Sequence, residues 1–172
     1  MHEKLRPILH KILEDYALPV NGYHGVAHWA RVLENGLRLS AETGADVEVV
    51  SLFAILHDSR RLNEGWDPDH GPRAALFAEK ILGTVFEMDP ERFFLLQEAC
   101  IGHTHEKTHQ NVTIQTCFDA DRLDLGRVGI RPDPRLLSTA AARSKAIINW
   151  ADGRASFGVV PEFVKDAWDI EL

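Results

Sequence analysis

The chain has 172 residues, of which 45% are hydrophobic and 26% are charged, values that are ordinary for a globular protein with a sizeable core. Its formal net charge of −7 argues against a protein that binds nucleic acid through a basic face. No apolar run approaches the ~20 residues of a membrane helix, and the N-terminus lacks the apolar region of a signal peptide, so no membrane partner is expected. Cys100 and Cys117 fall in helix-like stretches and are expected to be reduced core thiols, which favours a cytoplasmic location.

The first half of the chain predicts three helices. Apolar residues at helical spacing indicate helices over about residues 3–17 and 26–43, with a turn at 21–25 between them and a stop at Gly44. The most apolar run follows, at residues 49–56, where Asp46 can cap the N-terminus and Glu48 complements the helix dipole. This run is apolar on nearly every face, so we expect a central helix around which the others pack. His57 and Asp58 then emerge at its C-terminal end.

The second half of the chain predicts further helices separated by Gly- and Pro-rich loops. We expect helices over about residues 72–82, 90–101, 112–125, 138–151 and 161–168, with polar loops at 63–72 and 103–109. Gly83 and Gly126 are the expected stops of two of these helices, and Asp89-Pro90 opens another. No segment alternates convincingly as a strand would. The chain is therefore predicted to form one all-α domain over residues 1–172.

Four side chains at helix ends or on inner faces could form a metal site: His28, His57, Asp58 and Asp121. A buried imidazole and carboxylate are costly unless they are paired or bound to a metal. Two imidazoles and two carboxylates suit one divalent ion, such as Mn, Fe, Co, Ni, Zn or Mg. Adjacent helical side chains diverge by about 100 degrees, so His57 and Asp58 can share an ion only at the helix end, where the backbone can turn.

The ordered set His28, His57-Asp58 and Asp121 resembles the signature of the HD superfamily of metal-dependent phosphohydrolases. Residues 120–124, Ala-Asp-Arg-Leu-Asp, are similar to the final motif of that family, and the resemblance spans about residues 23–128. It implies a helical bundle with a central metal site that hydrolyses a small phosphoester, such as a nucleotide. Asp58 would orient or deprotonate the attacking water if one of its oxygens stays off the metal.

The family pattern selects Asp121 over Asp119 as the metal ligand, because it places the ligand before a basic residue and Leu. Asp119 would then cap a segment or orient a histidine. Asp124 shares a helical face with Asp121, and three roles stay open for it: to steady Arg122, to steady a ligand, or to be solvated.

Further residues are candidates for a second metal or for substrate. In some HD proteins, extra histidines after the His-Asp pair bind a second metal or contact phosphate. His70 and His103 follow His57-Asp58 in the sequence, as those histidines do. The alternative for each is a solvent-exposed loop residue. Of the arginines beside the proposed ligands, Arg61 and Arg122 are the preferred phosphate contacts, with a surface salt bridge as the alternative. His24 is a weaker candidate for substrate contact, and Trp66, in a loop that could close over the substrate, could stack on a base.

Two other functions stay open at this point. The HD fold also hosts di-iron oxygenases, in which extra histidines build a second iron site, and His70 and His103 keep that reading possible. A non-catalytic sensor that binds a metal or a nucleotide is the third reading. The sequence leaves open the substrate, the number of metals, the choice between phosphomonoesters and phosphodiesters, and the oligomeric state.

Overall fold

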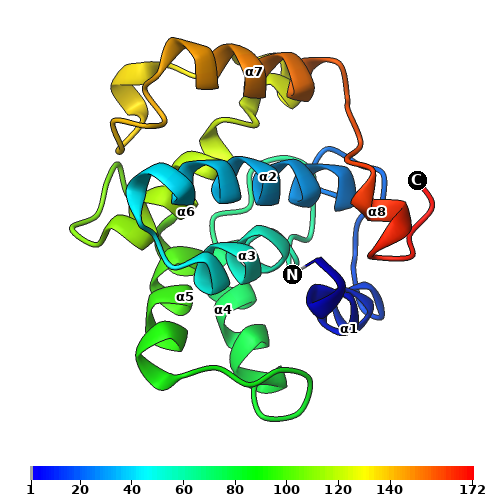
Figure 1. Ribbon diagram of the computed structural model, residues 1–172. Coiled ribbons are helices and arrows are strands. Elements are labelled where there is room, and N and C mark those ends of the chain that lie inside the picture. Colours follow the sequence, from blue (N-terminus) through cyan, green and yellow to red (C-terminus); the bar gives the residue numbers. More distant parts are fainter. Residues whose placement is uncertain (1) are drawn as a thin grey trace.

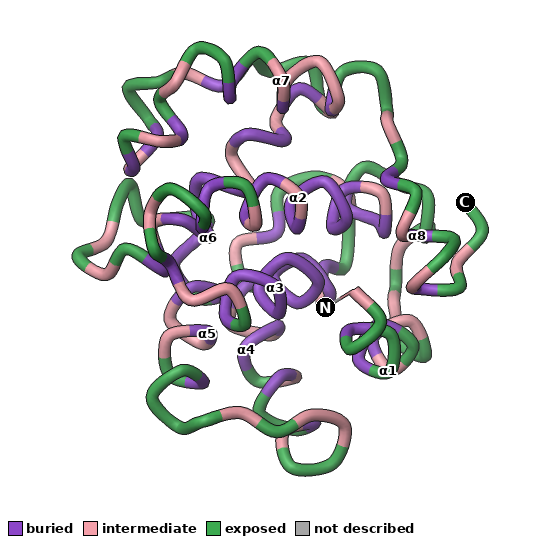
Figure 2. Tube along the Cα trace, in the orientation of Figure 1, coloured by how far each residue is buried: buried purple, intermediate pink, exposed green. Residues whose placement is uncertain are grey.

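Helix α3 (Val47–Leu56) lies at the centre of the protein in the computed structural model, which describes residues 2–172 (Figure 1). The carboxylate of Asp46 caps it by accepting hydrogen bonds from the backbone N–H groups of Glu48 and Val49, at 2.9 and 3.1 Å. Every residue from 49 to 56 is buried. Figure 2 shows α3 and much of α2 as long buried segments. The expected central helix is confirmed.

The other helices pack around α3 or against the outer side of α2. They are α1 (His2–Leu13), α2 (Val26–Thr43), α4 (His70–Ile81), α5 (Pro90–Gly102), α6 (Val112–Arg122), α7 (Lys145–Ser156) and α8 (Phe163–Asp166), with 3₁₀ turns η1 (Leu125–Val128) and η2 (Pro134–Leu136). Helices α1, α2, α4, α5 and α6 all contact α3. Between residues 2 and 172 the structure contains helices and no strand. Its one isolated β-bridge joins Leu82 to Phe86, so the all-α fold is confirmed.

A second, smaller apolar layer lies on the other side of α2. Helix α7 packs against α2 and η1 (Figure 1), where Leu39, Leu123, Ile147 and Ile148 are buried together. Helix α2 is thus covered by α3 on one side and by α7 on the other. This position explains why polar side chains of α2, including His28 and Arg31, are fully or nearly fully buried.

The expected helix over residues 138–151 is wrong in its first half. The buried carboxylate of Asp119 accepts hydrogen bonds from the backbone N–H groups of Ser138 and Thr139, both at 2.7 Å, and from the Thr139 hydroxyl at 2.8 Å. Thr139 Oγ1 in turn accepts from the N–H of Ala142 at 3.1 Å, so this segment forms a turn. Helix α7 begins only at Lys145. A side chain distant in sequence therefore overrides local helix propensity here.

Other boundaries shift by a few residues. Helix α1 ends at Leu13 rather than near 17, and α6 ends at Arg122 rather than near 125. Helix α2 spans 26–43 as expected, with Gly44 in the left-handed conformation (φ 72°) that its C-terminal stop requires. Cys100 and Cys117 are free and buried, as predicted. Among the described residues, no helix combines the length and the apolar character needed to cross a membrane.

Candidate metal centre

The four predicted metal-ligand side chains converge on one point. The Nε2 atoms of His28 and His57 lie 3.1 Å apart. Asp58 Oδ2 lies 3.5 Å from His28 Nε2 and 3.7 Å from His57 Nε2. Asp121 Oδ1 lies at the same two distances, 3.5 and 3.7 Å, from those nitrogens. The ligand atoms of His28, His57 and Asp121 all lie within 4.8 Å of one another and could hold a metal ion, and those of His57, Asp58 and His103 form a second such group.

The end of α3 is what brings His57 and Asp58 to the same side. After Leu56 the chain leaves the α-helix through a turn in which the N–H of Ser59 bonds to the carbonyl of Leu56 and that of Arg61 to the carbonyl of Asp58, at 2.9 and 3.2 Å. The two adjacent side chains therefore do not diverge as they would inside a helix. Helix α2 supplies His28 and the last turn of α6 supplies Asp121.

The hydrogen bonds of the two imidazoles fix which nitrogen faces the centre. His28 Nδ1 lies 2.7 Å from Asp124 Oδ2, and His57 Nδ1 lies 3.1 and 3.2 Å from the carbonyl oxygens of Phe53 and Ala54. These oxygens accept, so each Nδ1 carries the hydrogen and each neutral ring presents a lone pair at Nε2. Two lone pairs 3.1 Å apart, beside two carboxylates, repel unless a proton or cation lies between them. This set of donors could hold a metal ion.

Asp124 orients His28, which settles the role left open for it. It is 1% exposed, and besides His28 it accepts from Arg31 Nε at 2.7 Å and Nη2 at 3.1 Å. Burial alone would raise the pKa of Asp124, but His28 and Arg31 outweigh that effect and lower it. The carboxylate therefore stays charged and holds the imidazole in the tautomer suited to metal binding. Asp119 has the capping role of the two expected for it, at the turn over residues 138–142.

Electrostatics within the centre favour ion pairing between histidines and carboxylates. Burial tends to raise the pKa of Asp58 and of Asp121, but the neighbouring histidines outweigh it and hold both pKa values below the usual range. Burial also tends to lower the pKa of His57, yet the carboxylates of Asp58 and Asp121 raise it. A proton can therefore take the place of a cation at this centre when no metal is bound.

A second cluster adjoins the first through Asp58. Asp58 Oδ1 lies 3.1 Å from His70 Nε2 and 3.9 Å from His103 Nε2, and these two nitrogens are 2.8 Å apart. Their Nδ1 atoms face the backbone carbonyls of Asp67 and Cys100, at 2.5 and 2.7 Å, so again both lone pairs point inward. Burial and the nearby His57 lower the pKa of His103 to about 3, which disfavours a proton on that ring. The ligand atoms of His57, Asp58 and His103 lie close enough together to hold a metal ion, and His70 adjoins them with its Nε2 3.4 Å from Arg61 Nη1.

Close helix packing makes this second cluster possible. Gly71, next to His70 at the start of α4, lies against the end of α5, where a Cβ atom would come within 2.2 Å of the Cys100 carbonyl oxygen. Only glycine allows this approach, which brings His70 and His103 into contact.

Two arginines lie beside the centre, and one of them, Arg127, is not predicted from the sequence. Arg61 Nη1 is 3.5 Å from Asp58 Oδ1, as its sequence position suggests. Arg127 Nη2 is 4.0 Å from Asp121 Oδ1, and its Nη1 donates to the Asp124 carbonyl at 3.1 Å. No helical spacing links Arg127 to Asp121. It returns to the centre only because η1 forms after α6, and the only sequence signal is a basic residue close behind the final motif.

Arg122 does not reach the metal ligands. Its guanidinium donates to the backbone carbonyls of Lys107 at 2.7 Å, of Leu136 at 3.2 Å and of Glu106. It thereby joins the loop after α5 to the segment after η1. Neither Asp119 nor Asp124 pairs with it, so the alternative of a salt bridge with these residues is wrong.

The remaining candidates lie around the centre. His24 Nδ1 is 2.5 Å from Glu64 Oε2, and the His24 ring centroid is 6.3 Å from that of His28. Trp66 is 77% exposed and lies edge-on to His105, with ring centroids 6.4 Å apart. His24 therefore adjoins His28 without entering the ligand set, and Trp66 is an exposed side chain beside His105.

The residues could hold one divalent ion and accommodate a second, with guanidinium groups at the edge of the centre. Such an arrangement can polarise an anionic group and position a water molecule. The chain itself matches no protein-family model, no curated protein and no solved structure, so this geometry is the basis on which a function is inferred.

Proposed function

We propose that the protein is a divalent-metal-dependent phosphohydrolase of the HD superfamily, acting on a small phosphoester. The observation that carries this proposal is the convergence of His28, His57, Asp58 and Asp121, with both imidazoles held in the tautomer that a metal requires. Arg61 and Arg127 add positive charge beside the ligands. Metal together with guanidinium groups is a combination suited to a phosphate dianion.

The side chains around the centre would have separate roles in binding phosphate and in positioning the metal ligands. A divalent ion bound here would supply charge for a phosphoryl oxygen and lower the pKa of water. Arg61 and Arg127, whose side chains are each 9% exposed, would hold the other phosphoryl oxygens, because buried guanidinium groups bind phosphate strongly. Asp124 and the α3 carbonyls keep the two histidines in position.

The role of Asp58 depends on the second cluster. With one ion among His28, His57 and Asp121, Asp58 Oδ1 faces His70 at 3.1 Å and is free to orient or deprotonate a water molecule. If His70 and His103 held a second cation, Asp58 would help to hold it, and another group would have to accept the proton.

Phosphate release is the test of this proposal. Purified protein is stripped with chelator and assayed on nucleotide, sugar-phosphate and phosphodiester panels, with and without Mn, Co, Ni or Mg. Activity should require metal, and it should be lost in Asp121→Asn but retained in the control His10→Gln, whose ring only faces the carbonyl of Trp168. Silence on every panel with every metal would remove phosphohydrolysis and favour a metal- or nucleotide-binding sensor.

The paired histidines of the second cluster support one other enzyme class. His70, His103 and a bridging Asp58 are compatible with a di-iron oxygenase as well as with a two-metal hydrolase. Oxygen consumption by the iron-loaded protein distinguishes the two, because phosphoester hydrolysis proceeds equally well without O2.

A further inference from the structure

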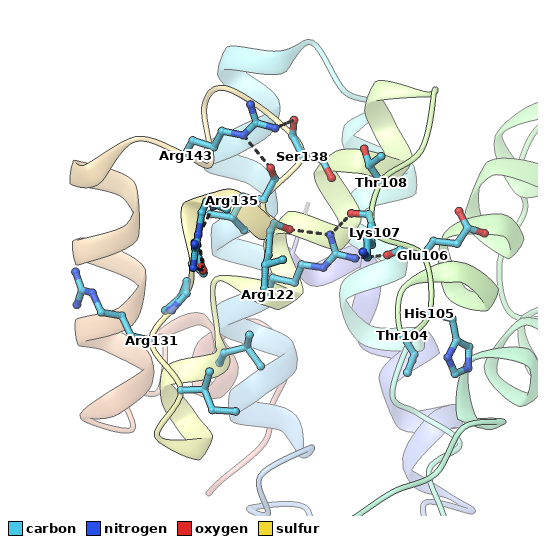
Figure 3. A pocket seen from close by; sticks show the side chains of 16 residues that line it. Thr104, His105, Glu106, Lys107, Thr108, Arg122, Arg131, Arg135, Ser138 and Arg143 are labelled. Carbon is cyan, nitrogen blue, oxygen red and sulfur yellow. Dashed lines mark hydrogen bonds and ion pairs between the residues drawn. The ribbon is translucent and has the colours of Figure 1, made fainter.

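A basic pocket begins where the second histidine cluster ends. The hydroxyl of Thr104 lies 3.3 Å from Nε2 of His70 and 3.3 Å from Nε2 of His103, and Thr104 also lines a cavity of about 470 Å³. This cavity, the basic pocket, is bounded by the loop at residues 104–108 and by segments between residues 122 and 143 (Figure 3). Thr104 thus connects the basic pocket to the second histidine cluster.

The charge of the basic pocket is opposite to that of the chain. Its lining carries five cationic side chains against the two carboxylates of Glu106 and Asp133, whereas the chain has a formal net charge of −7. The cationic residues are Lys107, Arg122, Arg131, Arg135 and Arg143. A concave surface of one sign concentrates ligands of the other sign.

Three of these cations form no salt bridge within 4.0 Å among residues 2–172, although Arg122 lies near enough to Asp119 to offset part of the rise in pKa that burial causes at that carboxyl. Arg143 donates to the backbone carbonyls of Leu137 and Ser138, at 2.8 and 3.2 Å, and Arg122 donates only to backbone carbonyls. Lys107 makes no side-chain ion pair with any described residue. Arg131 and Arg135, by contrast, are paired with Asp152 and Asp133. The basic pocket therefore presents an excess of positive charge, with the guanidinium groups of Arg122 and Arg143 held by backbone oxygens.

The unused donors are suited to a phosphate group. A guanidinium has five N–H groups, and Arg122 uses three of them on carbonyls, which leaves two for a ligand. Figure 3 shows the Arg122 guanidinium beside the loop at 106–107, with Arg143 next to Ser138. Exposed apolar side chains also line the basic pocket: Ile130 is 56% exposed and Leu136 is 61% exposed. Apolar walls beside the cations favour an organic phosphate over a free inorganic anion.

Building on the function proposed above, we propose that the basic pocket binds a second phosphate group of the same substrate whose first phosphate lies at the metal centre. Glu106 follows Thr104 by two residues, so their Cα atoms lie within about 8 Å, and the Glu106 carbonyl anchors Arg122. This short stretch of chain links the second histidine cluster to Arg122, so one nucleotide-sized molecule would reach both. The substrate class is therefore a sugar or nucleoside that carries two separate phosphate groups.

The experiment compares matched mono- and bisphosphates. Phosphate release is measured on glucose 6-phosphate against glucose 1,6-bisphosphate, and on AMP against adenosine 3′,5′-bisphosphate, by metal-loaded protein. In at least one pair the bisphosphate should have a kcat/KM at least about tenfold higher, because a charge-assisted hydrogen bond supplies about that factor. Lys107→Glu should reduce this ratio at least about tenfold through KM. The control Lys165→Glu, at an exposed lysine of α8, should leave the ratio unchanged.

Calorimetric titration of the same ligands separates this inference from the proposed function. Tighter binding of a bisphosphate that is lost in Lys107→Glu, without any phosphate release, would support the basic pocket and overturn hydrolysis. Phosphate release with equal preference for both members of each pair, unaffected by Lys107→Glu, would overturn the basic pocket and support hydrolysis. Absence of both binding and release would overturn both proposals.

Discussion

Replacing Asp124 by asparagine tests the claim that a buried carboxylate prepares His28 for metal binding. In the native protein the carboxylate accepts from three N–H groups, namely His28 Nδ1 and both Nε and Nη2 of Arg31. Asparagine keeps one acceptor oxygen and adds two N–H donors at the other position. The variant therefore cannot serve both His28 and Arg31, and it leaves the Arg31 charge buried and unpaired, at 5% exposure.

Two separate effects should follow from this single change. Loss of a carboxylate that orients a metal-binding histidine lowers metal affinity by about 10- to 100-fold. Breaking a buried ion pair on one side destabilises a protein by about 3–5 kcal/mol, a large part of the total stability of a typical domain. Metal affinity is measured by calorimetric titration with Mn or Zn, and stability by urea unfolding in chelator.

The double variant Arg31→Leu/Asp124→Asn separates the two effects. Removing the arginine removes the unpaired charge, so most of the stability should return, apart from about 1 kcal/mol for the lost bond to the Val159 carbonyl. Metal affinity should stay reduced, since the full charge opposite His28 Nδ1 is still missing. A folded Asp124→Asn protein with metal affinity within about twofold of the native value would refute the claim that this carboxylate sets up the ligand.

Three further predictions concern the metal, a loop and the central helix. Asp58 and Asp121 raise the pKa of His57 above 6.5, against the effect of burial. The ion pairs between protonated His57 and these carboxylates therefore stabilise the chelated protein fully below about pH 6.5. This stabilisation is lost as the pH rises through the pKa of His57 in the folded protein. Metal binding needs the neutral ring, so the gain in Tm on adding metal should grow from about pH 6 to about pH 8, and a constant gain would count against His57 as a ligand. Arg122→Ala should remove three hydrogen bonds to backbone carbonyls and lower the free energy of unfolding in urea by about 1–3 kcal/mol, while the metal content stays the same. A drop in metal content would mean that Arg122 supports Asp121. Asp46→Ala should remove the cap of α3 and cost about 1 kcal/mol, or about 2–4 °C in Tm, and an unchanged Tm would show that packing alone fixes this helix end.

The sequence predicts the metal-ligand quartet because its members stand at recognisable places. His57 and Asp58 follow the most apolar run, and Asp121 precedes a basic residue in an otherwise apolar helix. A helix that is buried on all faces has no solvent side for a polar end, so that end must find partners inside the protein. This local logic makes polar side chains at such places candidates for a metal site, and the resemblance to the HD superfamily selects Asp121 over Asp119.

Roles that depend on tertiary contacts are harder to predict from sequence. Arg122 has a place in the sequence that suggests contact with a phosphate at the metal, but carbonyl groups of two distant loops hold it elsewhere. Arg127 reaches the centre through a 3₁₀ turn that has no strong sequence signal. Asp119 similarly accepts hydrogen bonds from the backbone at residues 138–139, so α7 begins several residues later than expected. In each case the decisive partner is distant in sequence.

Metal content is the most direct measurement of the central claim. The native protein, His57→Ala, Asp121→Ala and the control His10→Ala are stripped, reloaded with Mn or Zn, freed of excess ion and analysed by elemental mass spectrometry. We predict at least one ion per chain in the native protein and in His10→Ala, and strong loss of metal in His57→Ala and Asp121→Ala. Equal metal content in all four proteins would contradict the assignment of these residues as ligands.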